Sequence, residues 1–445
     1  MESQEIRDRD LPGPRSPVVL QTLAWVLRPP LQRLLRLSAR YGDTFRLRVL
    51  GPPNSTDATS RPLVSRTIVF CSNPAVLREV FAPGRSDLRA GLAQEFTRWH
   101  VGAEAIVVLD GAAHEAERRR MGQLVRGVAA GDLAREAVAR SLTAWPEGTA
   151  SLHRLLRDTA LDVTLSTVFG RLEAPVLAEL RRLVRRGAIG TSVSPLLHVL
   201  PPLRARLGRW SPGSRLRQAV RAFDAFVTRE MSARRAQARP DGSFLDLLTG
   251  THCPGGRSIS LTGERARSLI GGLENIPAAT VWCATHAVTS PGLMDRIRLA
   301  SDDDPLPEAV CRESLRLNPP FIGGFRYVTA PLTLGGIRFE PGSLILPNPA
   351  SAHRNPTLYS DPHHFRPERF LERSFAAHEY APFGGGDRRC VAERMALDLM
   401  RLILRSIATT FELRPVRPWS SLERQDGLLL VPRDRLPVTL RRRRS

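Results

Sequence analysis

The stretch FGGGDRRCVAERMA, residues 383–396, places one cysteine behind three glycines and between arginines, immediately before a helical pattern. Glycines reach backbone conformations that other residues disfavour, so this loop can turn tightly and let a flat ligand approach its backbone. Cys390 can be an inert packing residue, a redox thiol or a metal ligand. The rest of the sequence has to decide among these three possibilities.

The surroundings of Cys390 favour a thiolate. A helix is predicted to begin just after this cysteine, with Met395, Leu399, Leu402 and Ile403 at core-facing spacing. A sulfur at a helix N-terminus, with arginines beside it, is expected to have a pKa below its ordinary value. The thiolate is the form that binds metal.

The composition excludes several classes of function. The chain has 445 residues and a formal net charge of +21, and its 65 basic residues are all arginine, because it contains no lysine. Such a bias indicates codon usage rather than a phosphate-binding surface, and no aromatic-interleaved basic block favours nucleic-acid binding. The missing lysine excludes a P-loop nucleotidase and a pyridoxal enzyme. The five cysteines lie far apart, which indicates neither a disulfide framework nor a structural zinc site.

The periodicity predicts a mainly α protein with small β-sheets. Helical spacing dominates from about residue 112 to 300, and strand-like alternation occurs at 44–50, 67–74 and 325–347. We predict one domain over residues 1–445, with a flexible N-terminal segment at 1–16 and a basic tail at 441–445. The sequence has no signal peptide core and no apolar run long enough to cross a bilayer, so we predict a cytoplasmic protein without a transmembrane segment.

A second motif lies in CRESLRLNPP, residues 311–320. Glu313 and Arg316 are three residues apart on one helix face, where they can pair. Arg369, in the turn-rich stretch FRPERF at 365–370, is expected to add a second guanidinium to Glu313. A carboxylate shared by two arginines would make a rigid structural pin.

Taken together, these motifs resemble those of the cytochrome P450 family. Phe383, Gly386, Arg388 and Cys390 match its FxxGxRxC loop, and the ExxR and FRPERF motifs occur in the right order and spacing. Ala392 stands where the family usually has glycine, which is a minor departure. The resemblance implies a cytochrome P450 fold, with haem between a long distal helix and a proximal cysteine-bearing loop and helix.

The family resemblance also implies which residues hold the cofactor, haem b. Cys390 is implied as the iron ligand, and a cysteine thiolate on haem iron favours cleavage of the O–O bond of dioxygen. Phe383 and Arg388 belong to the same loop. The implied partners of the haem propionates are His114 and Arg118 in LDGAAHEAERRRM, Arg326 in GGFRYV, and Arg388.

The expected distal helix, LIGGLENIPAATVWCATHAV at 269–288, departs from the family pattern. An acid followed by an alcohol usually relays protons there, but Glu274 is followed by Asn275, which cannot relay a proton as a hydroxyl does. Pro277 lacks an N–H and is expected to kink the helix by freeing the carbonyl of Leu273. Whether Pro277 has a mechanistic role or only fixes a kink stays open.

Three functions follow from these observations. The first is a monooxygenase that inserts one oxygen atom into a hydrophobic small molecule, a terpene, polyketide or lipid-like specialised metabolite, with Glu274 and Asn275 as candidate catalytic residues. The second is a thiolate-haem enzyme that performs oxidative coupling, desaturation or rearrangement without net oxygen insertion. The third is a non-catalytic haem-binding or basic interaction protein, which the surviving motifs disfavour.

The resemblance also implies partners and a substrate pocket. A ferredoxin and its reductase are the expected electron donors, docking on arginines 118–120, 388, 389 and 394; the alternative is that these are simply solvated arginines. An access lid is expected at 196–214. The candidate pocket residues are Trp99, Val107, Ile270, Leu273, Phe321, Ile322, Phe325 and Leu429.

Overall fold

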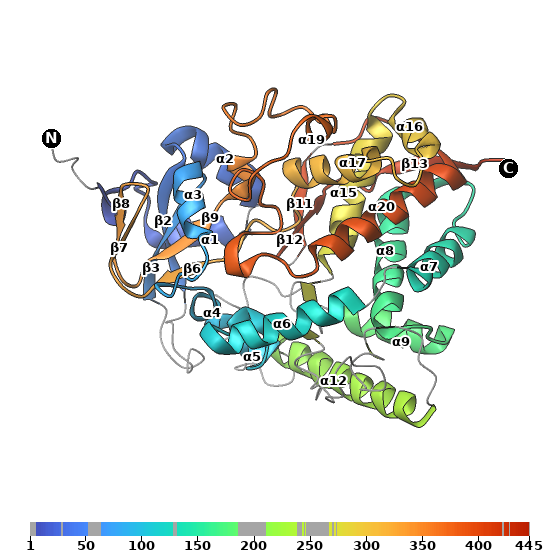
Figure 1. Cartoon of the computed structure of the whole chain (residues 1–445), viewed down its shortest axis with the longest axis horizontal. Helices are drawn as coiled ribbons and strands as arrows, with labels where there is room; N and C mark the ends of the chain where they lie inside the picture. Colours follow the sequence, from blue (N-terminus) through green and yellow to red (C-terminus); the bar gives the residue numbers. More distant parts are fainter. Residues whose placement is uncertain are drawn as a thin grey trace.

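A computed structural model of the chain describes residues 6–27, 30–51, 64–127, 131–185, 211–237, 274–420, 422–426 and 428–444, together with residues 243, 245, 267, 268, 271 and 272. Figure 1 shows a sheet-rich region at the left, built from the N-terminal segments and from strands near residues 326–347, and a larger helical region at the right. The predicted mainly α class with small β-sheets is confirmed. Residues 196–210 of the expected lid, and Ile270 and Leu273, lie outside the described residues.

The helical region contains most of the long helices, and the spacing of apolar residues accounts for their packing. In helix α20 (Glu393–Thr410), for example, Met395, Leu399, Ile403 and Ile407 are all buried on one face. The longer described helices are α1 (Val18–Leu27), α2 (Pro30–Tyr41), α6 (Gly111–Gly127), α7 (Asp132–Thr143), α8 (Leu152–Phe169), α9 (Ala174–Leu183), α12 (Pro212–Gln237), α15 (Asn275–Thr289), α17 (Leu306–Leu317) and α20 (Glu393–Thr410). Shorter ones are α3 (Pro74–Val80), α4 (Ala90–Ala93), α5 (Arg98–Val101), α16 (Leu293–Leu299), α18 (Pro349–Ala352) and α19 (Arg369–Glu372).

The largest sheet has five strands in the order β2-β3-β9-β6-β4. Phe45, Leu47 and Val49 of β2 are buried, whereas the residues between them are partly or fully exposed, as expected of a strand with one face on the core. The strands are β2 (Thr44–Gly51), β3 (Val64–Cys71), β4 (Leu88–Arg89), β6 (Arg326–Val328) and β9 (Leu344–Pro347).

Three smaller sheets complete the described part of the fold. Their strand orders are β1-β8-β7, β10-β13-β5 and β11-β12. Their strands are β1 (Ile6–Arg7), β5 (Gly148–Ser151), β7 (Leu332–Leu334), β8 (Ile337–Phe339), β10 (Phe411–Pro415), β11 (Glu423–Asp426), β12 (Leu429–Pro432) and β13 (Pro437–Arg442).

Described residues near both ends of the chain pair with strands from the rest of the molecule. Within the segment 1–16, for which flexibility was predicted, β1 pairs with β8 and the buried Asp8 accepts a hydrogen bond from the Ser343 hydroxyl. The basic tail at 441–445 begins later than predicted. Arg441 and Arg442 pair with β10, and the Arg442 guanidinium lies 4.8 Å from the centre of the Phe411 ring.

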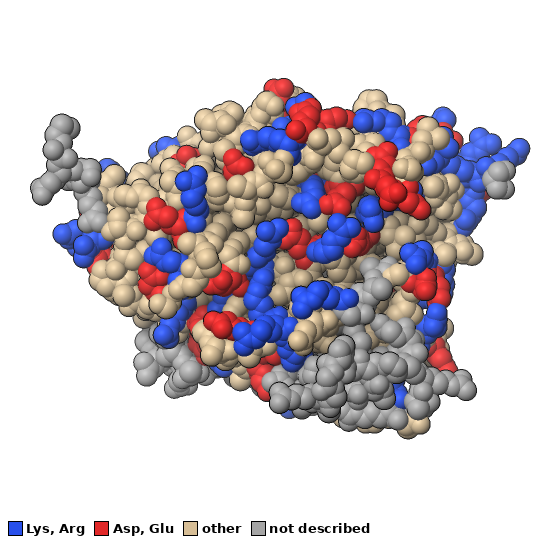
Figure 2. All heavy atoms as spheres, in the orientation of Figure 1, with Lys and Arg blue, Asp and Glu red and all other residues tan. Residues whose placement is uncertain are grey.

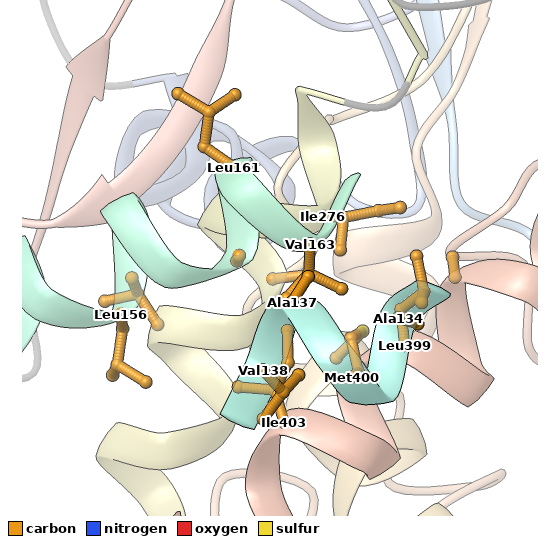
Figure 3. Packing of buried hydrophobic residues seen from close by; sticks show 14 of the residues in the cluster. Ala134, Ala137, Val138, Leu156, Leu161, Val163, Ile276, Leu399, Met400 and Ile403 are labelled. Atoms are coloured by element: carbon orange, nitrogen blue, oxygen red, sulfur yellow. The ribbon is translucent and has the colours of Figure 1, made fainter. Parts of the chain in front are cut away.

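The main hydrophobic core joins α7, α8, α15, α17 and α20. Figure 3 shows part of this cluster, with side chains such as Val138, Val163, Ile276 and Ile403 contributed by four different helices. Helix α15 lies in the middle of the group and is buried from Ile276 to Thr285 without interruption. A helix that is apolar on all sides belongs inside a helical core.

Candidate active site

The cysteine loop is a tight turn that leads into α20. Gly384 and Gly386 have φ values of +73° and +61°, a region that favours glycine, and the Cys390 N–H donates to the Phe383 carbonyl over 2.9 Å. Helix α20 begins at Glu393, three residues after the cysteine. The cysteine is exposed, and it lines a cavity.

The residue that approaches the glycines of this loop most closely is Phe81 of the same chain. A Cβ built on Gly385 would overlap the Phe81 ring, and one on Gly386 would lie 2.6 Å from the Phe81 carbonyl oxygen. Phe81, a buried residue, follows α3 and contacts the loop. The sequence interpretation missed this contact, because nothing near Phe81 marks it as a partner of a loop so distant in the chain.

The cavity beside Cys390 has a volume of about 970 Å³. Its walls are the turn after α3, helix α6, Arg326 at the start of β6, and the cysteine loop from Gly385 to Val391. His114, Arg118, Arg326, Arg388 and Cys390, all predicted as cofactor contacts, line it together. Phe383 instead packs against the main core and is not among the described residues of the cavity wall.

Arg326 is a buried cation that faces this cavity. Its Nη1 donates to the carbonyls of Gly324 (3.1 Å) and Phe325 (3.2 Å), and no carboxylate of the described residues forms an ion pair with it. Burial lowers the pKa of Arg326 to about 10, and the neighbouring Arg388 contributes to the fall. Such an arginine is suited to an anionic group entering the cavity.

His114 and Arg118 lie one helical turn apart on α6, on the same wall. Burial, with the charges of Arg388 and Arg118, lowers the pKa of His114 to about 4, so its imidazole is neutral near pH 7. It can therefore contribute a hydrogen bond rather than a positive charge. Arg118 donates to the Arg389 carbonyl and forms no ion pair with a carboxylate in the described part of the chain.

Arg388 already has a partner. Its Nη2 donates to Asp110 Oδ1 and, over 2.7 Å, to the Leu109 carbonyl. Asp110 also accepts from the N–H groups of Gly91 and Leu92, each at 2.8 Å, so this carboxylate ties α4 to the cysteine loop. Asp110 was not predicted as a site residue, although its position beside Gly111, with φ +57°, marks the tight start of α6.

The pKa of Cys390 differs from expectation. Burial raises the pKa of its thiol and outweighs the Ala392 N–H and the arginines 118 and 389, which lower it, so the prediction of a depressed pKa is wrong for the protein without metal. The residue is exposed on the side of the cavity, and the packing of the protein around the sulfur still disfavours the anion. A bound metal cation would deprotonate a coordinating thiol outright.

The distal residues lie in and before the first turn of α15. Glu274 precedes the helix, and Asn275 donates from Nδ2 to the Gly272 carbonyl over 2.8 Å. Pro277 lies in the first turn of α15, and Leu273, whose carbonyl it was expected to free, lies outside the described residues. Glu274 and Pro277 line a second cavity of about 240 Å³, with His153, Ala278 and Leu429 among its walls.

The expected pin around Glu313 is confirmed. Glu313 Oε2 accepts from Arg316 Nε at 2.7 Å, and Oε1 accepts from Arg316 Nη2 (2.9 Å) and Arg369 Nε (3.1 Å). The side chains of Glu313 and Arg316 are fully buried. The remaining arginine donors bind carbonyls of residues 353–364, which fixes the segment that leads toward the cysteine loop.

None of the candidate pocket residues that the structure describes lines the large cavity. Trp99 packs on Leu216 and Val220 of α12, and Ile322 and Phe325 pack beside the five-stranded sheet. Leu429, at the start of β12, contacts Ala278 of α15.

Comparison with known proteins identifies the family. The family model described as Cytochrome P450 matches residues 11–438. A putative cytochrome P450 135B1 of Mycobacterium tuberculosis is 27% identical, covering 95% of this chain and 89% of the relative. A putative cytochrome P450 138 of the same species is 27% identical, covering 97% and 96%. The chain therefore belongs to the cytochrome P450 family.

The structural comparison agrees on the fold. A cyanobacterial cytochrome P450, CYP120A1, solved with bound retinoic acid, has a TM-score of 0.76 with 19% sequence identity, covering 95% of this chain and 96% of that one. The protein is accordingly a P450 monooxygenase, an oxidoreductase with a haem cofactor.

The cavity suits that cofactor. It brings together one cysteine sulfur and a buried arginine without a carboxylate partner among the described residues, which match the iron and a carboxylate of a haem. None of the helices in the described part of the chain has the length and hydropathy needed to cross a membrane.

Proposed function

We propose that this enzyme inserts one oxygen atom of dioxygen into a hydrophobic small molecule, with haem b bound through Cys390. The observation that carries the proposal is that Cys390 shares one cavity of about 970 Å³ with Arg326, Arg118 and His114. A thiolate-ligated haem, when bound, supplies the electron-rich iron that cleaves dioxygen. We also propose that residues 1–445 form a single catalytic domain.

In this proposal the propionates are held by residues of three elements. Arg326, on β6, gives a buried charge-assisted hydrogen bond, and Arg118, on α6, gives a second cation. His114, one turn before Arg118, donates as a neutral imidazole. Arg388 adds positive potential from the cysteine loop while its bond to Asp110 holds the loop in place. Phe383 holds the cysteine backbone through its carbonyl oxygen.

Glu274 and Asn275 are the proposed proton-handling residues. Glu274 faces the second cavity together with His153, whose neutral form is favoured because burial lowers its pKa to about 4. Asn275 Oδ1 is buried and accepts no hydrogen bond from any described residue. It is thus an acceptor suited to hold a water molecule that donates to it, while Glu274 exchanges the proton.

A ferredoxin and its reductase are the proposed electron donors. Arg126, exposed on α6, forms no ion pair with a described carboxylate, which leaves its charge available to an acidic partner, whereas the charge of Arg118 is assigned to a propionate. Arg389 and Arg394 are less available, because Glu393 and Asp398 bind them over 2.6 and 2.7 Å. Figure 2 shows the same mixture, with arginines and acids interspersed on this face.

The substrate is proposed to be a terpene, polyketide or lipid-like specialised metabolite, handled in the cytoplasm. Ala278, Val281, Leu429 and Val431 give the second cavity apolar walls beside the start of α15, which suits a hydrocarbon surface.

One observation favours a second function. Asn275 occupies the position where the family usually carries an alcohol, so the proton relay that supports oxygen insertion is altered. We therefore keep oxidative coupling, desaturation or rearrangement without net oxygen insertion as the alternative. Turnover under ¹⁸O₂ separates the two: a product heavier by one labelled oxygen supports insertion, and a product without label assigns the alternative.

A further inference from the structure

Two cysteines that lie 28 residues apart in the sequence meet in the main core. Cys283, on α15, and Cys311, on α17, are 1% and 0% exposed, and their sulfur atoms lie 3.6 Å apart. Their spacing along the chain does not predict this contact. Neither cysteine lines the two cavities described above, so the pair has no part in the proposed oxygen chemistry.

The other described cysteines are not arranged in this way. Cys71 lies in the apolar cluster beside the five-stranded sheet, and Cys390 borders the haem cavity. Cys253 lies outside the described residues. Among the described cysteines, Cys283 and Cys311 are thus the two whose sulfur atoms are in contact.

The contact is close to the geometry of a covalent bond. A disulfide holds its sulfur atoms about 2.0 Å apart, so the two sulfur atoms have to approach each other by roughly 1.6 Å. Helices α15 and α17 pack directly against each other, and Figure 1 shows them side by side. Rotation of the two side chains about their Cα–Cβ bonds moves the sulfur atoms while the helices stay packed.

We propose that Cys283 and Cys311 are a modification site, at which hydrogen peroxide forms a disulfide that joins α15 to α17. The peroxide first oxidises one thiol to a sulfenic acid and releases one water molecule. The second thiol then displaces the hydroxyl group as a second water molecule. Two S–H bonds break and one S–S bond forms, and the peroxide takes up the two electrons and two protons. A dithiol reverses the reaction by exchange.

The position of the pair determines when this reaction occurs. The hydrogen bond to Cys311 and burial raise the pKa of Cys283 well above its ordinary value, so the thiolate that attacks peroxide is scarce while the core is closed. Oxidation therefore requires local opening of the core. The same burial protects the disulfide from dithiols after it has formed. We expect a modification that forms slowly and is reversed slowly.

The disulfide would join two functional helices. Asn275 begins α15 about two turns before Cys283, and Glu313 follows Cys311 by two residues on α17. A cross-link between residues 28 apart restricts the unfolded chain and so favours the folded state. The oxidised protein should therefore unfold at a higher urea concentration than the reduced protein.

The experiment treats the haem-loaded protein with hydrogen peroxide in urea below the unfolding transition, where local opening is more frequent. Catalase then stops the reaction, and free thiols are blocked with N-ethylmaleimide during unfolding. Mass spectrometry of an unreduced digest should show the peptide of Cys283 joined to that of Cys311, with a mass two hydrogen atoms below their sum. The carbon monoxide spectrum after the catalase step reports damage at the haem separately.

Matched variants test the assignment. Cys283→Ala and Cys311→Ala should each abolish both the joined peptide and the rise in the urea midpoint. Cys71→Ala, which removes another buried cysteine, should leave both unchanged. The proposal would be overturned if peroxide left both thiols free for the maleimide. It would also be overturned if peroxide oxidised the two residues separately to sulfinic acids, or joined either one to a different cysteine.

Discussion

Glu313 and Arg316, three residues apart on α17, form an ion pair whose side chains are fully buried, with Arg316 Nε 2.7 Å from Glu313 Oε2. Arg369 joins the same carboxylate from the segment before the cysteine loop, 3.1 Å away. A buried carboxylate that serves two guanidinium groups is costly to remove, because both cations would stay buried without an anion.

Glu313→Gln is therefore expected to destabilise the protein by about 3–5 kcal/mol. The measurement is the free energy of unfolding in urea. The matched control is Glu412→Gln, which breaks a pair with the 78%-exposed Arg414 and should cost less than about 1 kcal/mol. Equal losses in both variants would show that the buried pair is not a structural pin.

Gly385→Ala should destabilise the protein by about 1–3 kcal/mol, because the new methyl group meets the Phe81 ring. The φ of Gly385 is −150°, which alanine tolerates, so the clash is the main cost. In a Phe81→Ala background the same substitution should therefore cost clearly less.

Gly386→Ala provides the contrast. It meets the backbone oxygen of Phe81 and has a φ of +61°, so Phe81→Ala should not rescue it. A double-mutant cycle in urea measures both couplings, and zero coupling between Phe81 and Gly385 would contradict the predicted contact.

Arg326→Met should separate cofactor binding from folding. The buried guanidinium has no carboxylate partner among the described residues, so the haem-free protein should become no less stable without it. Haem affinity should fall about ten- to hundredfold, the loss expected for a charged hydrogen bond.

Haem transfer to apomyoglobin measures this affinity, and Arg414→Met, far more exposed, is the control. Loss of stability in the haem-free Arg326→Met protein, with unchanged haem transfer, would contradict the assignment.

His353 should make stability depend on pH. Its Nε2 accepts from the Ala381 N–H at 2.9 Å, so Nδ1 carries the proton and donates to the Arg316 carbonyl. Burial and the Arg316 charge lower its pKa from 6.5 to about 3, so the unfolded chain binds the proton first as pH falls.

This histidine should therefore reduce the free energy of unfolding between pH 6.5 and 3, by about 2 kcal/mol at pH 5 relative to pH 8. His353→Gln should flatten that part of the profile. An unchanged slope from pH 8 to 5 would contradict the neutral buried state.

Local motifs were predictable, and contacts between distant segments were not. The cysteine loop and Glu313 with Arg316 could be predicted, because their chemistry lies within a few residues. Phe81 and Asp110 could not, because each acts on the loop from a distant part of the chain and neither occurs in a distinctive local pattern. The fall in the Cys390 pKa was wrongly predicted, because helix ends and arginines are visible in a sequence but desolvation is not.

Which side of α1 faces the protein could not be predicted from the sequence either. Its apolar composition predicts a helix, but only the hydrogen bonds of Gln21 and Thr22 to β2 reveal that the polar side is buried. Pro277 lies in the first turn of α15, and Leu273, whose carbonyl it was expected to free, lies outside the described residues, so the kink stays a prediction. Where a helix begins depends on tertiary packing as well as on the proline.

The central claim is that Cys390 binds haem iron as a thiolate. The most direct test is the absorption spectrum of the dithionite-reduced, carbon monoxide-bound protein, for the wild type, Cys390→Ala and the control Cys71→Ala, which changes a buried cysteine of β3. We predict a strongly red-shifted Soret band in the wild type and the Cys71 variant, and its loss in Cys390→Ala. A band at the position of a histidine-ligated haem in the wild type, or an unchanged band in Cys390→Ala, would contradict the account.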